Sequence, residues 1–202
     1  MFKRSILAGL MIALAMVLYT KTLTLSNTFG SDLYKMAGAV IFAFALTYVK
    51  EQGLPLFTGK TGTDFSQKAL WAVVLPFNLI GSALIAIPAT FCGYKDFEIL
   101  YNATVNDTPE NMLFKAILCG ALMRVACSSS SVYVTIGCVF AFLMSGFYHS
   151  IALSAVYFAN LCTNADFNLG RYSMLIAIAV VGNFLGGCLI TFLKDEKLVF
   201  KK

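Results

Sequence analysis

The chain has 202 residues, of which 59% are hydrophobic and only 12% are charged. Soluble domains carry about 25% charged residues, so this composition, with a mean hydropathy of +0.79, excludes a soluble enzyme or a soluble nucleic-acid-binding protein. The net charge of +5 requires no nucleic acid partner, because membrane proteins carry an excess of Lys and Arg on their inner loops.

Apolar stretches dominate the chain, and six of them approach or exceed the length of about 20 residues that a helix needs to cross a bilayer. They cover residues 5–21, 33–52, 69–91, 112–127, 132–158 and 172–193. We therefore predict an all-α integral membrane protein with six transmembrane helices in contact with the lipid bilayer. All of them belong to a single domain over residues 1–202.

The first apolar stretch follows Lys3 and Arg4, as the core of a cleaved signal peptide would. It is long for such a core, however, and no small-x-small cleavage site follows it. We expect a retained first helix.

The positive charges favour a cell-membrane protein with both termini in the cytoplasm. With the N-terminus inside, Lys and Arg are more frequent on the inner side than on the outer side, as the positive-inside rule requires. The inner side then holds Lys3, Arg4, Lys60, Lys68, Lys194, Lys197, Lys201 and Lys202, and the outer side holds Lys21, Lys35, Lys95, Lys115 and Arg171.

An internal repeat divides the chain into halves of about 1–95 and 110–202. Residues 4–15 (RSILAGLMIALA) match residues 115–126 (KAILCGALMRVA), and the third apolar stretch of each half contains Asn-x-x-Gly. Three spans per half force the second half to enter the membrane from the opposite side, which predicts an inverted 3+3 repeat. The alternative is chance similarity among helices rich in Leu, Ala and Gly.

In inverted-repeat transporters the substrate site is commonly formed by discontinuous helices, and the middle stretch of each half contains helix-breaking residues. Gly53 and Pro55 interrupt the second stretch, and Ser145 and Gly146 interrupt the fifth. The string Gly59-Lys60-Thr61 also suggests a phosphate-binding loop, but that loop needs four residues between its glycines, whereas five separate Gly53 from Gly59. We interpret the string as a helix break.

His149 is the only histidine and lies inside the fifth apolar stretch. An ionisable residue at membrane depth is a candidate functional residue, and the alternative is a neutral histidine bonded to a carbonyl freed by the helix break. A hydrolase using Ser145 or Ser150 lacks a buried acid to orient the imidazole, so we do not expect an enzyme. The six cysteines show no metal-ligand spacing, and we expect neither a metal nor a cofactor.

Three motifs together resemble the formate/nitrite transporter family: residues 53–59 (GLPLFTG), residues 144–152 (MSGFYHSIA) and the two Asn-x-x-Gly helices. The resemblance covers nearly the whole chain. It implies an aquaporin-like six-helix fold with broken second and fifth helices, assembled as a homopentamer. It also implies a channel for small monovalent anions.

The resemblance further implies roles for individual residues. Leu56, Phe57 and Thr58 stand in the pore loop of the second span, and His149 stands at the central pore histidine. Two hydrophobic constrictions are expected to flank that histidine. Phe142 falls with Leu56 at the inner one, and the outer one is formed by Phe42 and Leu46.

The chain departs from the family pattern around the histidine. Tyr148 replaces the usual acidic residue, Leu153 and Gly120 replace asparagines, and the usual lysine of the fifth helix falls near Ser131. Two other cationic residues could attract anions in place of the missing lysine, namely Arg124 and Lys50. Arg124 could instead pair with Glu51 or with a freed carbonyl.

These residues predict passive or proton-coupled transport of an anion such as formate, nitrite or hydrosulfide. A midplane histidine is suited to exchange a proton with such an anion and so to lower the cost of its passage. Two alternatives stay open: a channel for a neutral solute such as hydrogen sulfide, ammonia or a weak acid, and a membrane scaffold that transports nothing.

Overall fold

The computed structural model describes residues 1–62, 66–164 and 167–194, and every regular element in these ranges is helical. Lys197, Lys201 and Lys202, which contribute to the predicted orientation, lie outside the described residues. The elements are α1 Phe2–Phe29, α2 Asp32–Glu51, α3 Phe57–Lys60, α4 Gln67–Ala69, the π-helical turn η1 Leu70–Val74, α5 Leu75–Phe91, α6 Phe97–Val105, α7 Pro109–Ser128, α8 Val132–Met144, α9 Ser150–Thr163 and α10 Leu169–Leu193.

Within the described residues, five helical segments are long and apolar enough to cross a membrane: α1, α2, η1 with α5, α7 and α10. The apolar stretch at 132–158 forms two shorter helices, α8 and α9, because the chain leaves helical geometry between Met144 and Ser150. The sequence analysis did not predict α6, whose residues lie between two apolar stretches.

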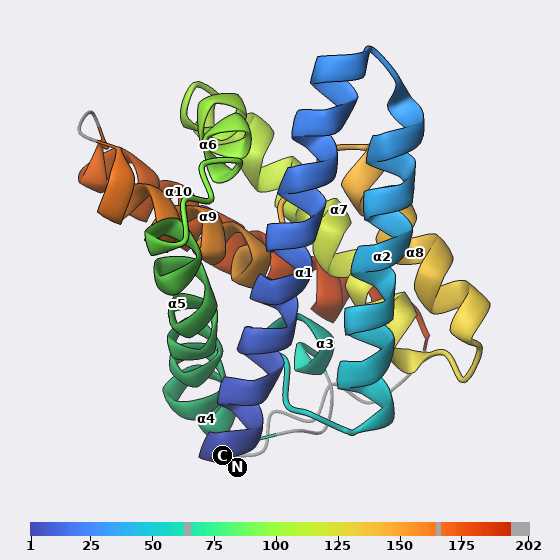
Figure 1. Ribbon diagram of the computed structural model, residues 1–202. Coiled ribbons are helices and arrows are strands. Elements are labelled where there is room, and N and C mark those ends of the chain that lie inside the picture. Colours follow the sequence, from blue (N-terminus) through green and yellow to red (C-terminus); the bar gives the residue numbers. More distant parts are fainter. Residues whose placement is uncertain (63–65, 165–166, 195–202) are drawn as a thin grey trace.

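Helix α1 runs antiparallel to α2 and packs against it (Figure 1). The N-terminal turn of α1 lies beside the break after α2, where Arg4 Nη2 donates to the carbonyls of Gln52 at 2.6 Å and Gly53 at 3.2 Å. The opposite end of α1 meets the segment that precedes α6, where Lys21 Nζ is 3.7 Å from an Asp96 carboxylate oxygen. We call these two ends of the molecule the Arg4 end and the α6 end.

Glycines allow close packing of α1 on α5 and of α7 on α10. A Cβ atom at Gly81 of α5 would lie 2.0 Å from the carbonyl oxygen of Ile6, and one at Gly186 of α10 would lie 2.0 Å from that of Ile117. Ile6 and Ile117 hold matching positions in the two repeated segments. Because small residues let membrane helices approach each other, the repeat seen in the sequence is also a repeat of helix contacts.

Candidate functional site

The break between α2 and α3 is held by the side chain of Asn78 on α5. Its Oδ1 accepts from the backbone N–H of Phe57 at 2.8 Å, and its Nδ2 donates to the carbonyls of Pro55 at 3.0 Å and Ser5 at 2.7 Å. Non-helical backbone in a membrane interior needs such partners, because no water is available to satisfy it. Asn78 therefore supplies both a donor and an acceptor to the broken chain.

Asn183 on α10 holds the break between α8 and α9 in the same way. Its Oδ1 accepts from Ser150 N–H at 2.8 Å, and its Nδ2 donates to the carbonyls of Tyr148 and Ala116, each at 2.8 Å. The residue between the two anchored backbone positions is His149 here and Leu56 in the first break. Each of these two residues is the N-cap of the helix that follows.

His149 is buried, with 2% of its surface exposed, and both of its ring nitrogens make hydrogen bonds. Nδ1 accepts from the backbone N–H of Ala152 at 3.1 Å, which caps α9. Nε2 lies 2.9 Å from Oγ1 of Thr58 on α3. A nitrogen that accepts carries no proton, so the neutral imidazole in this arrangement has its proton on Nε2 and donates it to Thr58.

Two phenylalanine rings lie beside the histidine. The Phe142 ring stacks on the His149 ring with centroids 5.8 Å apart, and Phe42 meets Phe142 edge-on, also at 5.8 Å. Phe42 and Phe142 therefore form one aromatic layer beside His149. The assignment of these two rings to an outer and an inner constriction stays a prediction. The spacing in the sequence aligned both residues correctly with α2 and α8 but did not show that the two helices bring the rings together.

The other predicted pore residues are buried around this layer. Leu46 lies one turn after Phe42 on α2, and Leu56 occupies the first break; 1% and 2% of their surfaces are exposed. Phe57 packs edge-on against Trp71 of η1, with ring centroids 5.1 Å apart.

A cavity of about 330 Å³ opens on the α6 side of His149. His149 and Phe142 line it, and two lysines, Lys35 and Lys115, add positive charge to its wall. We call it the His149 cavity. Its remaining walls come from α1, α6, α8, α9 and the break between α8 and α9. The side chains are apolar or carry hydroxyls, namely Met16, Tyr19, Leu23, Ile99, Leu100, Ala103, Thr104, Leu143, Phe147, Tyr148, Ala152, Leu153 and Val156, together with Gly146.

Lys50 and Arg124, the predicted cations, lie toward the Arg4 end, where α3 packs on α7. Lys50 Nζ donates to Thr135 Oγ1 at 2.7 Å and to the Ala126 carbonyl at 3.3 Å. Arg124 is 7% exposed, and its Nε donates to Thr191 Oγ1 of α10 at 2.9 Å. Glu51, considered as a partner of Arg124, is exposed.

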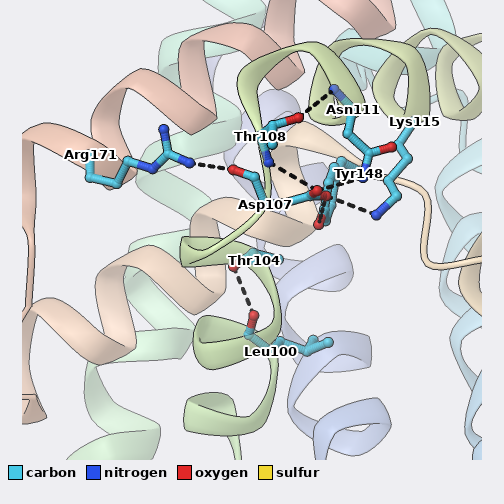
Figure 2. Close-up of polar contacts among 8 residues, drawn as sticks. All are labelled: Leu100, Thr104, Asp107, Thr108, Asn111, Lys115, Tyr148 and Arg171. Carbon is cyan, nitrogen blue, oxygen red and sulfur yellow. Dashed lines mark hydrogen bonds and ion pairs between the residues drawn. The ribbon is translucent and has the colours of Figure 1, made fainter.

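At the α6 end, a second polar cluster forms around Asp107 in the linker between α6 and α7 (Figure 2). Asp107 Oδ2 accepts from Tyr148 Oη at 2.7 Å and from Lys115 Nζ at 2.8 Å. Its Oδ1 accepts from Asn111 Nδ2 at 2.5 Å and from Thr108 N–H at 3.1 Å. Partial burial opposes ionisation, but the bonds from Lys115, Tyr148 and Asn111 outweigh it and hold the pKa of Asp107 below its ordinary value.

Comparison with other proteins shows the family of this chain. A model of the formate/nitrite transporters matches residues 1–194. The chain belongs to the formate/nitrite transporter family. The family assignment made from the pore-loop and histidine motifs is thereby confirmed.

Similar family members are nitrite transporters and formate channels, not enzymes. The nitrite transporter NirC of Salmonella typhimurium is 29% identical over 174 residues, which are 73% of this chain and 63% of that protein. NirC of Escherichia coli is 27% identical over 206 residues (90% and 73% of the two chains), and the formate channel FocA of Haemophilus influenzae is 29% identical over 178 residues (75% and 63%). The chain thus matches less than two thirds of the length of two of these relatives.

Two solved structures share the fold. An ion channel of the formate/nitrite transporter family superposes with a TM-score of 0.80 at 23% identity, over 96% of this chain and 87% of that one. A pentameric formate channel with formate bound superposes with a TM-score of 0.77 at 22% identity, over 96% and 94%. With the five membrane-capable helices, these matches identify a multi-pass membrane protein.

The sequence predicted neither the Asp107 cluster nor the hydrogen bonds that Asn78 and Asn183 make to the backbone of the two helix breaks. Asn78 and Asn183 serve in the sequence analysis only as markers of the repeat and of the family resemblance. Asp107 carried one available signal, since it stands directly before Thr108 and Pro109, a typical helix start. Its contact with Tyr148 spans 41 residues of sequence and follows no local pattern.

Proposed function

We propose that this protein is a transmembrane channel or transporter for small monovalent anions such as formate, nitrite or hydrosulfide. The observation that carries the proposal is the contact between His149 and Thr58, which joins the two helix breaks at the end of a cavity with a positively charged wall. Membership of the family and the names of the similar proteins support the same substrate class.

The Thr58 hydroxyl is the group that we expect to meet the permeant. Its oxygen accepts the Nε2 proton of His149, which leaves its own hydrogen to donate elsewhere. A hydrogen bond to a charged group contributes roughly 1.5–3 kcal/mol, and it replaces part of the hydration that an anion loses among Phe42, Phe142 and Leu56. The hydroxyl therefore lowers the barrier without adding a fixed charge.

Proton-coupled transport sets a further requirement on His149. To become a cation the ring needs a proton on Nδ1 as well, and Nδ1 now accepts from Ala152 N–H. A cycle in which a cationic His149 gives its Nε2 proton through Thr58 to an anion must therefore open the α9 cap and close it again. Passive passage past a neutral ring needs no such rearrangement.

The number of membrane spans, the inverted repeat and the orientation in the membrane are part of the same proposal. Six spans arise when α2 with α3 and α8 with α9 each count as one broken helix beside α1, η1–α5, α7 and α10. Halves of about 1–95 and 110–202 then form an inverted repeat within one domain. The protein lies in the inner membrane, and the Arg4 end and both termini face the cytoplasm. At the Arg4 end, Lys50 and Arg124 attract anions.

We further propose a homopentamer with a pore in each protomer, supported by the pentameric formate channel of the same fold. Large apolar side chains such as Phe44, Phe114 and Phe192 are more than 60% exposed, so the helices offer surface to lipid or to neighbouring protomers. Native mass spectrometry in gentle detergent tests the stoichiometry, and a monomer or tetramer would contradict it.

The transport proposal is tested by reconstituting the purified protein in liposomes. Flux of formate, nitrite and hydrosulfide is measured at pH 5 and pH 8, and currents are recorded in planar bilayers. Anion flux above that of protein-free liposomes supports the proposal. Permeation of uncharged solutes alone, with no current at either pH, identifies a neutral-solute channel. Flux no greater than the control identifies a scaffold.

A further inference from the structure

The charges around the His149 cavity are unequal, because its described wall contains two lysines and no carboxylate. One of these lysines, Lys115, is paired with a carboxylate outside that wall. Lys35 and Lys115 both line the cavity, and Asp107 is not among the described residues of its wall. Asp107 nevertheless lies 2.8 Å from Lys115 Nζ. The potential that an entering solute meets is therefore set by Lys115 and by the carboxylate that partly offsets it.

The ion pair is held in place from several sides. Tyr148, whose ring lies under Lys115 Nζ at 5.2 Å from the centroid, donates its phenol proton to Asp107. Arg171 of α10 donates to the Asp107 backbone carbonyl (Figure 2). Only 11% of the Asp107 side chain and 30% of the Lys115 side chain are exposed. Limited solvent access weakens screening by salt, so each charge acts on the cavity more strongly than a surface charge would.

We propose that Asp107 is a specificity-determining residue. The Asp107 carboxylate offsets the charge of Lys115 and thereby limits how strongly the cavity favours anions over uncharged solutes. This inference rests on the proposed anion pathway. Lys115 raises the local concentration of a small anion, and Asp107 lowers it. The pair acts through the field in the cavity and needs no direct contact between Asp107 and the permeant.

A purely structural role for Asp107 makes a different prediction. Asp107 also accepts from Thr108 N–H and from Tyr148, so it fixes the start of α7 and the residue before His149. If that were its whole contribution, loss of either Asp107 or Lys115 would disturb the same cluster and lower flux. An electrostatic role predicts changes of opposite sign for the two residues.

The test compares Asp107→Asn, Lys115→Gln and the double variant in liposomes, with formate as the anion and glycerol as an uncharged solute. Asn removes the charge, keeps one acceptor oxygen for Thr108 N–H, and places an Nδ2 donor beside the Tyr148 hydroxyl. We expect Asp107→Asn to lower the KM for formate at least about threefold, and Lys115→Gln to raise it by a similar factor. The double variant is expected to fall between the single ones, and the glycerol rate to change little in all three.

Asp96→Asn is the matched control. Asp96 also pairs with a lysine at the α6 end, Lys21, and its side chain is equally exposed at 11%. Lys21, unlike Lys115, does not line the His149 cavity. We expect its KM for formate to equal that of the wild type. A change as large as that of Asp107→Asn would mean that any carboxylate at this end has the effect, which overturns the assignment.

The remaining outcomes separate this inference from the transport proposal. If the wild type carries no anion, the proposed function fails. If the wild type transports formate but both single variants raise the KM, the assignment of Asp107 is wrong and the cluster is structural. Asp107→Ser, which removes the charge and keeps a hydroxyl able to accept from Thr108 N–H, carries the same expectation as Asn. Failure of both variants to assemble would likewise show a structural role.

Discussion

Asn78 and Asn183 make matching sets of three hydrogen bonds in the two halves of the molecule. Each accepts from the first residue of the helix after a break, and each donates to the carbonyl two residues earlier and to a carbonyl of the neighbouring long helix. The two asparagines thus place Leu56 and His149 at equivalent positions. One half of the repeat presents an apolar side chain there, and the other half presents the only histidine of the chain.

Asn183→Ala is expected to destabilise the protein strongly. It removes the Nδ2 donor to the carbonyls of Ala116 and Tyr148 and the Oδ1 acceptor for Ser150 N–H. Asn183 has no exposed surface, and each buried group left unsatisfied costs about 1–3 kcal/mol. We expect a loss of roughly 3 kcal/mol or more, measured by thermal unfolding in detergent. Asn102→Ala, at an exposed position of α6, is the control. An equal effect of both changes would show that the hydrogen bonds of Asn183 do not stabilise the break between α8 and α9.

Gly186→Ala is expected to separate α10 from α7. The added Cβ would lie 2.0 Å from the Ile117 carbonyl oxygen, and overpacking of this kind typically costs 1–3 kcal/mol. Gly137→Ala on α8, where a Cβ meets nothing within 4 Å, is expected to be neutral or to stabilise by up to about 1 kcal/mol through helix propensity. Equal melting temperatures for the two variants would show that the close contact does not matter.

Hydropathy predicted the long helices, because a span of the bilayer requires a continuous apolar segment. Gly53 and Gly146, both in the left-handed region at φ 58° and 66°, marked the two breaks in advance. Helix α6 could not be predicted in this way, since polar residues interrupt it. The pairing of Phe42 with Phe142 and of Asp107 with Tyr148 depends on how distant helices pack, and no local periodicity records that.

Thr58→Val is expected to reduce anion flux while leaving assembly intact. Valine keeps the shape of threonine but removes the oxygen that lies 2.9 Å from His149 Nε2. The loss of roughly 1.5–3 kcal/mol of hydrogen bonding to a charged permeant corresponds to about a tenfold to hundredfold lower rate. Thr58→Ser restores the hydroxyl and should retain most of the flux. Unchanged formate flux in Thr58→Val liposomes would remove Thr58 from the pathway.

The contribution of Asp107 to stability is expected to depend on pH in the acidic range. Burial works against ionisation, but hydrogen bonds from Lys115, Tyr148 and Asn111 keep the pKa of Asp107 below its ordinary value of 3.8. A lowered pKa in the folded state means that stabilisation is complete above the unfolded pKa and is lost as the pH falls through the folded one.

Thermal unfolding of wild type and Asp107→Asn between pH 7 and pH 3 measures this dependence. The difference in melting temperature should stay constant from pH 7 to about pH 5 and shrink below about pH 4. Asp96→Asn, for which the same series is recorded, controls for general effects of acid on the protein. A difference that grows as the pH falls would show that the carboxylate is not stabilised by its partners.

The last prediction concerns His149→Asn, which separates hydrogen bonding from proton exchange at the end of the cavity. Asparagine is a favourable N-cap, so it can accept from Ala152 N–H in place of Nδ1 and preserve the start of α9. It cannot take up or release a proton near neutral pH, whereas histidine titrates in that range when its surroundings allow. We therefore expect the variant to assemble as the wild type does.

Flux of formate and nitrite into liposomes is then measured at pH 5 and pH 8. We expect the variant to lose the difference between the two pH values and most of the flux at pH 5, where proton exchange with a weak acid contributes most. His149→Phe, which removes both the cap and the bond to Thr58, should fail at both values or fail to assemble. A wild-type pH profile in His149→Asn would show that the imidazole serves only as a cap for the broken helix, and the proposed mechanism would lose its central residue.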